Sequence, residues 1–243
     1  MNTFSDSAAT ALHLLISFDP QLWVIVGRSL AVSATACAVG YGLGVLLGAA
    51  LAVSQFRGRA TVLVLLNTLL ALPSVVVGLV VYLLLSRTGP LGFLGWLFSF
   101  KAMVLAQVIL VLPVVAALTR QVVEDVERQH GEQWASLGAG TVLRSLLLAW
   151  DERMALMTIF VTAFGRAISE VGAVMIVGGN IDGFTRVMTT AIALETSKGD
   201  LPLALALGLV LLAVVGLLNL LVALLRNRGE RSGPSSPALV GGL

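Results

Sequence analysis

Five long apolar runs, separated by polar segments, restrict what this chain can fold into. Apolar residues make up 58% of its 243 residues and charged residues only 12%, whereas an ordinary soluble domain is about 25% charged. A helix needs about 20 apolar residues to cross a bilayer. Runs of about that length or longer occupy residues 22–53, 61–85, 101–119, 154–177 and 201–225. The sequence therefore predicts an all-α integral membrane protein with about five transmembrane helices.

The two ends of the chain differ from this apolar core. Leu12, Leu15 and Ile16 lie at helical spacing, but their apolar patch is short. Residues 1–21 are therefore predicted to form a helix on the membrane surface. After Gly229 the chain is rich in Ser, Pro and Gly, and residues 226–243 are predicted to be a disordered tail. We expect one membrane domain, 1–243, with its core at 22–225.

A polar segment, residues 120–153, lies between the third and fourth runs and must face water because it holds many of the charged residues. Within it, Glu132 to Gly138 is typical of a short helix that ends in a turn. A second helical stretch follows, with one apolar face made by Val142, Leu143, Leu146 and Leu147. An exposed helix pair with an apolar face predicts a docking site for another protein.

The distribution of Lys and Arg predicts the orientation, since cytoplasmic loops carry an excess of basic residues. If segment 120–153 is cytoplasmic, the N-terminus is outside and the C-terminus inside. Nine basic residues then lie inside and four outside: Arg57, Arg59, Arg120, Arg128, Arg144, Arg153, Arg226, Arg228 and Arg231 against Arg87, Lys101, Arg186 and Lys198.

Two groups of residues inside the predicted spans are candidates for a transport path or gate. Pro73 and Ser74 interrupt the second span, where proline kinks a helix and frees a backbone carbonyl. Arg166 and Glu170 are four residues apart in the fourth span and are expected to pair on one helix face. This pair either holds the span against its neighbours or lends positive potential to a passing anion.

The first run carries closely spaced glycines, a pattern that lets membrane helices approach one another. We expect them to serve packing, with lining of a path as the alternative. They are Gly27, Gly40, Gly42, Gly44 and Gly48.

The sequence lacks the common signatures of catalysis and cofactor binding. Lys101 and Lys198 follow Phe100 and Ser197, so the Gly-Lys pair of a Walker A motif does not occur. One Cys and two His offer no set with metal-ligand spacing. We therefore expect a transport subunit and not an enzyme, with no cofactor, no metal and no nucleic-acid partner.

Several stretches resemble the permease subunits of ABC importers for oxyanions. Residues 164–181, FGRAISEVGAVMIVGGNI, are similar to a segment of the molybdate and sulfate permeases, and most similar to that of the tungstate permeases. Residues 71–78, 86–92 and 189–197 follow the same pattern. Segment 120–153 resembles the coupling loop of these permeases, in which a Glu opens the motif and a Gly closes it, as Glu132 and Gly138 do here. The likeness covers residues 29–225.

This resemblance implies a type I fold like that of the molybdate and methionine permeases, in a homodimer in the inner (plasma) membrane. It also implies two cytoplasmic ATPase subunits, which bind the ATP, and an extracytoplasmic oxyanion-binding protein. Coupling to the ATPase would involve Glu132, Ala135, Leu137 and Gly138, and docking of the binding protein would involve Arg87, Arg186 and Lys198. Tungstate is the expected substrate, with molybdate and sulfate as alternatives. An ion-coupled carrier is the alternative of another class, and it would need an ionisable membrane residue that changes its charge.

Overall fold

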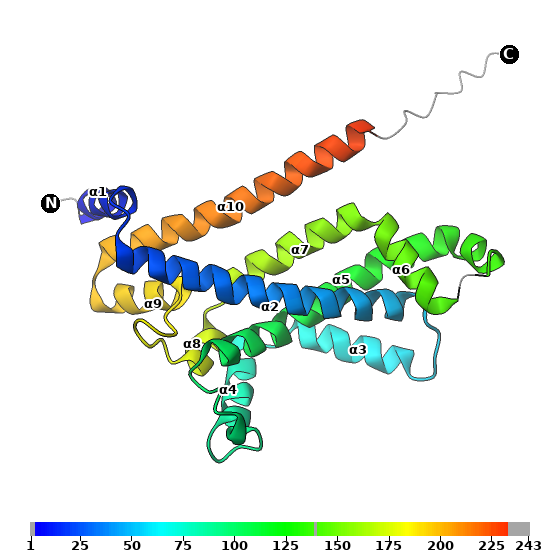
Figure 1. Cartoon of the computed structure of the whole chain (residues 1–243), viewed down its shortest axis with the longest axis horizontal. Coiled ribbons are helices and arrows are strands. Elements are labelled where there is room, and N and C mark those ends of the chain that lie inside the picture. Colours follow the sequence, from blue (N-terminus) through cyan, green and yellow to red (C-terminus); the bar gives the residue numbers. More distant parts are fainter. Residues whose placement is uncertain (1–2, 139, 233–243) are drawn as a thin grey trace.

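A computed structural model describes residues 3–138 and 140–232, and within these ranges every regular element is a helix. Figure 1 shows the long helices lying side by side along one direction. In chain order the elements are α1 (Thr3–Ile16), α2 (Pro20–Val53), α3 (Arg59–Leu70), α4 (Ser74–Leu85), the 3₁₀ turn η1 (Gly92–Leu94), α5 (Phe100–Ser136), α6 (Thr141–Asp151), α7 (Arg153–Ile168), α8 (Gly172–Gly178), α9 (Met188–Lys198) and α10 (Leu201–Ser232).

Three of the described helices are long and apolar enough to cross a membrane, namely α2, α5 over Phe100–Gln129, and α10 over Leu201–Leu224. The second and fourth predicted spans are each a bent pair of shorter helices. α3 and α4 meet at 101°, and α7 and α8 meet at 55°. The all-α membrane fold is confirmed, with up to five spans if each bent pair counts as one. The kink expected at Pro73 lies where the chain turns, and the turn of 101° is more than a right angle, so α3 and α4 are separate helices.

The centre of the fold is the contact between α2 and α5, which pack along much of their length. Gly40, Gly44 and Gly48 form one edge of α2 that lies directly against α5. A methyl group on Gly44 would come within 2.7 Å of Val115 Cβ, and one on Gly48 within 2.4 Å of the Ala116 carbonyl oxygen. The packing prediction is therefore confirmed for these three glycines. Gly27 and Gly42 face open space and have nothing within 4 Å of a built Cβ.

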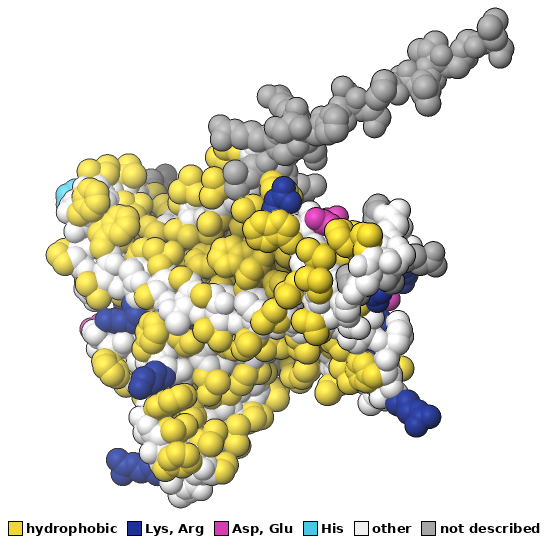
Figure 2. All heavy atoms as spheres, turned by 45° about the vertical axis from the view of Figure 1, so that its right-hand side comes forward, with side chains coloured by type: hydrophobic (Ala, Val, Ile, Leu, Met, Phe, Trp, Pro, Cys, Tyr) yellow, Lys and Arg dark blue, Asp and Glu magenta, His cyan; other side chains and the backbone are white. Residues whose placement is uncertain are grey.

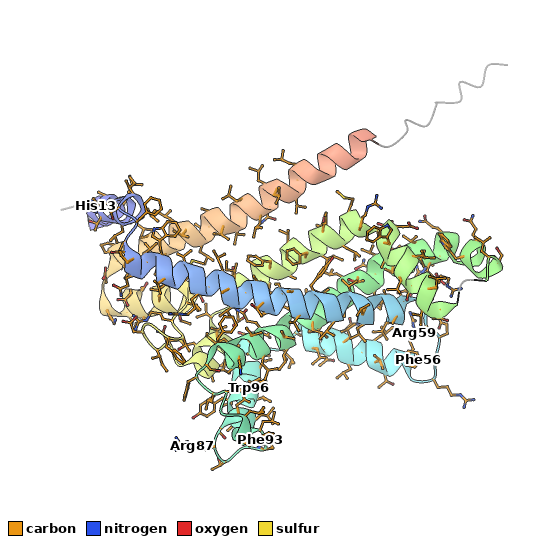
Figure 3. The ribbon with its side chains drawn as sticks, in the orientation of Figure 1. His13, Phe56, Arg59, Arg87, Phe93 and Trp96 are labelled. Atoms are coloured by element: carbon orange, nitrogen blue, oxygen red, sulfur yellow. The ribbon has the colours of Figure 1, made fainter. Side chains whose placement is uncertain are left out.

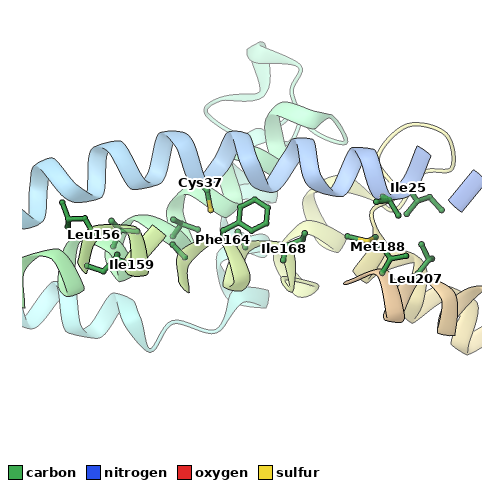
Figure 4. Close-up of a cluster of buried hydrophobic side chains, with 14 of the residues drawn as sticks. Ile25, Cys37, Leu156, Ile159, Phe164, Ile168, Met188 and Leu207 are labelled. Atoms are coloured by element: carbon green, nitrogen blue, oxygen red, sulfur yellow. The ribbon is translucent and has the colours of Figure 1, made fainter. Parts of the chain in front are cut away.

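A hydrophobic cluster joins α2 to α7, α9 and α10 (Figure 4). Cys37 of α2 is fully buried there, as expected for a small apolar residue, and Phe164 and Ile168 reach the cluster from α7. Met188, at the start of α9, and Leu207 of α10 extend the cluster toward Ile25, near the N-terminal end of α2. The cluster therefore holds α7 and α10 on one side of the central helix pair.

The ends of the chain depart in part from the prediction. α1 packs against α10 and buries Ala11 completely. α10 continues as a helix to Ser232, so residues 226–232 are not the start of a disordered tail. The remaining tail, 233–243, lies outside the described residues. Beyond its first turns α10 keeps large apolar side chains exposed, among them Leu212, Leu217 and Leu220. Figure 2 shows hydrophobic side chains covering the middle of one side of the molecule, with Lys and Arg side chains toward its margins.

Candidate functional site: two broken helices and a docking helix

The two helix breaks lie against each other. α4 begins at Ser74 just after the first break, and α8 begins at Gly172 just after the second. A methyl group on Gly172 would lie 2.9 Å from Ser74 Oγ, and one on Gly78 would lie 2.8 Å from Ala173 Cα. α4 and α8 therefore pack with their backbones nearly touching. Two candidate pairs predicted from distant segments, Pro73 with Ser74 and Arg166 with Glu170, thus belong to one region of the fold.

Three side chains hydrogen-bond to the backbone at the α7–α8 break, where the Ala167 carbonyl also accepts from the Glu170 amide at 3.2 Å. Gln107 of α5 is buried, and its Nε2 donates to the Ala167 carbonyl at 2.8 Å. Thr189 of α9 donates to the Glu170 carbonyl at 2.8 Å. The Glu170 carboxylate accepts from the Ala173 amide at 3.1 Å and so caps the start of α8. An unpaired backbone group in an apolar interior costs free energy, so these three contacts let the helix stop and restart.

The expected ion pair between Arg166 and Glu170 does not form between these two described residues, and this prediction is wrong. α7 ends at Ile168, so the two side chains do not follow one continuous helix. The Glu170 carboxylate is used by the α8 amide instead, while the Arg166 side chain is exposed at the surface of α7. Arg166 therefore does not neutralise Glu170 in this structure.

Arg166 lies on a polar stripe of α7. Thr158, Thr162, Arg166 and Ser169 follow one another at helical spacing, and the last three are exposed. The stripe borders an open groove of about 540 Å³ between α5 and α7, lined by Thr158 and Thr162 together with Leu118 and Val122. Arg166 is about 20 Å along α7 from Arg153, at 1.5 Å per residue, and the hydrocarbon core is about 30 Å thick. A charge at that depth requires water or another protein chain beside it.

A small polar cavity lies behind the α7–α8 break. Its volume is about 10 Å³, and Ser29, Ser33, Gln107, Glu170 and Thr189 line it. Gln107 Oε1 is buried there without a hydrogen-bond partner among the described residues. The space suits about one water molecule, which would satisfy this oxygen. The cavity is too small for a tetrahedral oxyanion in this conformation.

The polar segment 120–153 has the expected turn and second helix, but its first helix is the continuation of α5 and not a separate short helix. α5 runs on from the membrane span to Ser136 and includes Glu132 and Ala135 in its last turns. Gly138 adopts a φ of +78°, the left-handed conformation that glycine supplies at a helix C-terminus. α6 follows and buries Ser145, Leu148 and Ala149 against the body. Its opposite face is apolar yet exposed, through Val142, Leu143, Leu146 and Trp150, with Leu137 of the turn beside it.

The three basic residues predicted to dock a binding protein differ in exposure. Arg87 is exposed and borders a cavity of about 450 Å³ with Tyr82 and Phe98, near the tip seen in Figure 3. The Lys198 side chain is 52% exposed and pairs with Glu195 at 3.1 Å. Arg186 is only 9% exposed, and it lies 3.2 Å from Asp182 and 4.0 Å from Glu195. Arg186 is thus already paired within this chain, so a partner would meet it only after these contacts rearrange.

Sequence reasoning missed the role of Gln107 and Thr189 at the break. Both are buried polar residues, and Gln107 lies within a predicted apolar span. A buried amide in a membrane helix is a functional or structural signal by itself. Its partner, Ala167, is 60 residues away, which local spacing does not disclose.

Comparison with known proteins identifies relatives over most of the chain. The tungstate uptake system permease protein TupB of Peptoclostridium acidaminophilum is 43% identical over 222 residues, covering 91% of this chain and 97% of that protein. A probable anion ABC transporter permease protein of Haloferax volcanii is 42% identical, covering 84% and 90%. The molybdenum transport system permease protein ModB of Escherichia coli is 31% identical, covering 76% and 85%. No protein-family model matches the chain.

These relatives are transport permeases, and they align with both the broken helices and the docking helix. The apolar helices of this chain, with three to five candidate spans, also indicate a multi-pass membrane protein. The chain therefore belongs to the family of ABC-transporter permease proteins for oxyanion uptake.

Proposed function

We propose that this chain is the membrane subunit of an ATP-driven importer for a tetrahedral oxyanion, with tungstate as the substrate. The observation that carries the proposal is a broken-helix membrane core joined to an exposed apolar docking helix, in a chain 43% identical to a tungstate uptake permease. Molybdate and sulfate come next, because the molybdenum and sulfate permeases are more distant relatives. The chain supplies the path, and ATPase subunits supply the energy.

The path runs along the polar stripe of α7. Arg166 offers a positive charge at depth, and the hydroxyl groups of Thr158, Thr162 and Ser169 line the same face. The two threonine hydroxyls already donate to backbone carbonyls one turn earlier, so Arg166 and the Ser169 hydroxyl are the donors available to an anion. One exposed arginine holds an anion only briefly, which suits release toward the cytoplasm.

Two copies of the chain close this path. α4 leaves the body of the molecule almost at a right angle to α3 (Figure 1). It exposes Val75, Leu79 and Leu83 along its length. Arg166 is the feature that calls for a second chain, because lipid covers the apolar arm but not a charge, whereas a second chain covers both. A homodimer with the α7 stripes facing each other satisfies both.

The docking helix recruits the ATPase from the cytoplasmic side. α6 presents Val142, Leu146 and Trp150 outward, a ridge that fits a groove in a partner. In this orientation the N-terminus and Arg87 are outside. Cysteine labelling of intact cells should then reach Arg87→Cys with an impermeant reagent, and reach Arg128→Cys only after permeabilisation. The reverse accessibility would overturn the orientation.

The function itself is tested in proteoliposomes that contain the permease and its ATPase, with the binding protein added outside. Tungstate uptake should require ATP, both polypeptides and the binding protein, and vanadate should stop it. Uptake driven by a proton or sodium gradient without the ATPase would replace this proposal with an ion-coupled carrier. Titrating the binding protein with tungstate, molybdate and sulfate then ranks the substrates.

A further inference from the structure

A cluster of charged side chains ties the docking helix to the broken spans at one end of the molecule. α5 presents Glu124 and Glu127 on one face, three residues apart. Glu127 Oε1 lies 2.9 Å from Arg144 Nη2 of α6. Glu124 Oε1 lies 3.4 Å from Arg59 Nη2, where α3 begins. Figure 3 shows Arg59 near the C-terminal end of α2.

Both pairs are shielded from water to a similar degree. The side chains of Arg144 and Glu127 are each 19% exposed, and those of Arg59 and Glu124 are 19% and 20% exposed. Arg144 stands in the first turn of α6, where the helix dipole disfavours a cation. Glu127, which faces it at 2.9 Å, offsets this unfavourable interaction. Pairs shielded in this way hold their geometry better than ion pairs at an open surface.

The Arg59 pair reaches further into the fold. Arg59 Nε also donates to the Leu51 carbonyl at 3.2 Å, which fastens the start of α3 to the end of α2. α3 leads directly to the break at residues 71–73, and α4 beyond it packs on α8 at the second break. One route from α6 to the first break therefore runs through Glu127, one turn of α5, Glu124 and Arg59, beside the packing of α6 on α2.

We propose that the Arg144–Glu127 and Arg59–Glu124 pairs are the mechanical link that transmits movement of the docking helix α6 to the broken span α3–α4. This inference rests on the proposed function, in which an ATPase moves α6. Without the pairs α6 would still dock through its apolar face, but its displacement would be absorbed between α6 and α5. ATP hydrolysis would then continue, but the α3–α4 span would not move and the transport path would not open. The four residues are positioning residues and do not touch the substrate.

The chain offers a matched control in Arg128. It also pairs with Glu124 at 3.4 Å, but its side chain is 72% exposed and it belongs to α5 itself. It joins no second helix, so its loss should leave the link intact. Arg128→Gln removes the same charge as Arg144→Gln or Arg59→Gln, which separates loss of the link from loss of positive charge.

The first experiment measures tungstate imported per ATP hydrolysed by the reconstituted complex. Arg144→Gln and Arg59→Gln should each lower this ratio roughly fivefold or more, the scale of a typical coupling free energy, while ATPase binding persists. Arg144→Lys should restore much of the ratio, and Arg128→Gln should leave it unchanged. A wild-type ratio in Arg144→Gln, or an equal loss in Arg128→Gln, would overturn the proposal.

The second experiment does not depend on transport. Spin labels at Leu65→Cys on α3 and Asp151→Cys on α6, in a Cys37→Ala background of the full-length permease, report the distance between the two helices. The distance distribution should be narrow in the parent and in Arg128→Gln, and broad in Arg144→Gln. An unchanged distribution in Arg144→Gln would refute the link. If the wild-type complex imports no oxyanion, the proposed function fails while this measurement still judges the link.

Discussion

Replacing Gly48 by alanine should separate α2 from α5, because there is no space for even one methyl group. The added Cβ would lie 2.4 Å from the Ala116 carbonyl oxygen and 2.9 Å from Thr119 Cβ. The first of these is about 1 Å short of ordinary contact in a close-packed interior, and it involves backbone that cannot rotate away. Overpacking of this kind costs about 1–3 kcal/mol.

Gly42→Ala is the matched comparison on the same helix, since nothing lies within 4 Å of its added Cβ. Alanine is the better helix former by about 1 kcal/mol, and both variants share that gain. The difference in unfolding free energy between them therefore isolates the packing effect, at about 1–3 kcal/mol. Unfolding in mixed detergent micelles, followed by circular dichroism, measures it. Equal stability of the two variants would refute the close α2–α5 packing described here.

Two further changes test the helix break and the docking turn. Gln107→Ala should destabilise the protein by about 1 kcal/mol, because it removes the buried hydrogen bond from Gln107 to the Ala167 carbonyl. Asn219→Ala on exposed α10 should cost little in the same detergent unfolding assay, and equal losses would argue against a role of Gln107 at the break. Gly138→Val should abolish ATPase recruitment in a pull-down, because valine resists the φ of +78° that this position adopts. Gly138→Asn should retain recruitment. Normal recruitment by the valine variant would contradict the role of this turn.

Local patterns predicted the apolar spans and the docking turn well, because both depend on neighbouring residues. The run of small and apolar residues around Gly44 and the turn at Gly138 each carry their own signal. The break after Ile168 has no such signal, since no proline stands there. It exists because Gln107 and Thr189 supply hydrogen bonds from elsewhere in the fold.

The same reason explains why the ion pairs were misplaced. A spacing of four predicts a pair only on an unbroken helix, so Arg166 and Glu170 were matched wrongly. The pairs that do form across elements join Glu127 to Arg144 and Glu124 to Arg59, and their sequence separations follow no helical period. The sequence therefore predicted which segments carry the site residues. It did not predict which of these residues contact one another across helices.

The central claim is that an oxyanion passes along the α7 stripe beside Arg166, and the rate of ATP-driven tungstate uptake by an Arg166→Gln complex tests it most directly. Arg166 has no partner among the described residues, so the variant should fold, assemble with the ATPase and hydrolyse ATP normally. Uptake should fall by roughly tenfold or more, the effect of losing about 1.4 kcal/mol of favourable interaction. Thr158→Val, on the same stripe but uncharged, should reduce uptake far less. Uptake at the wild-type rate by an assembled Arg166→Gln complex would contradict the account.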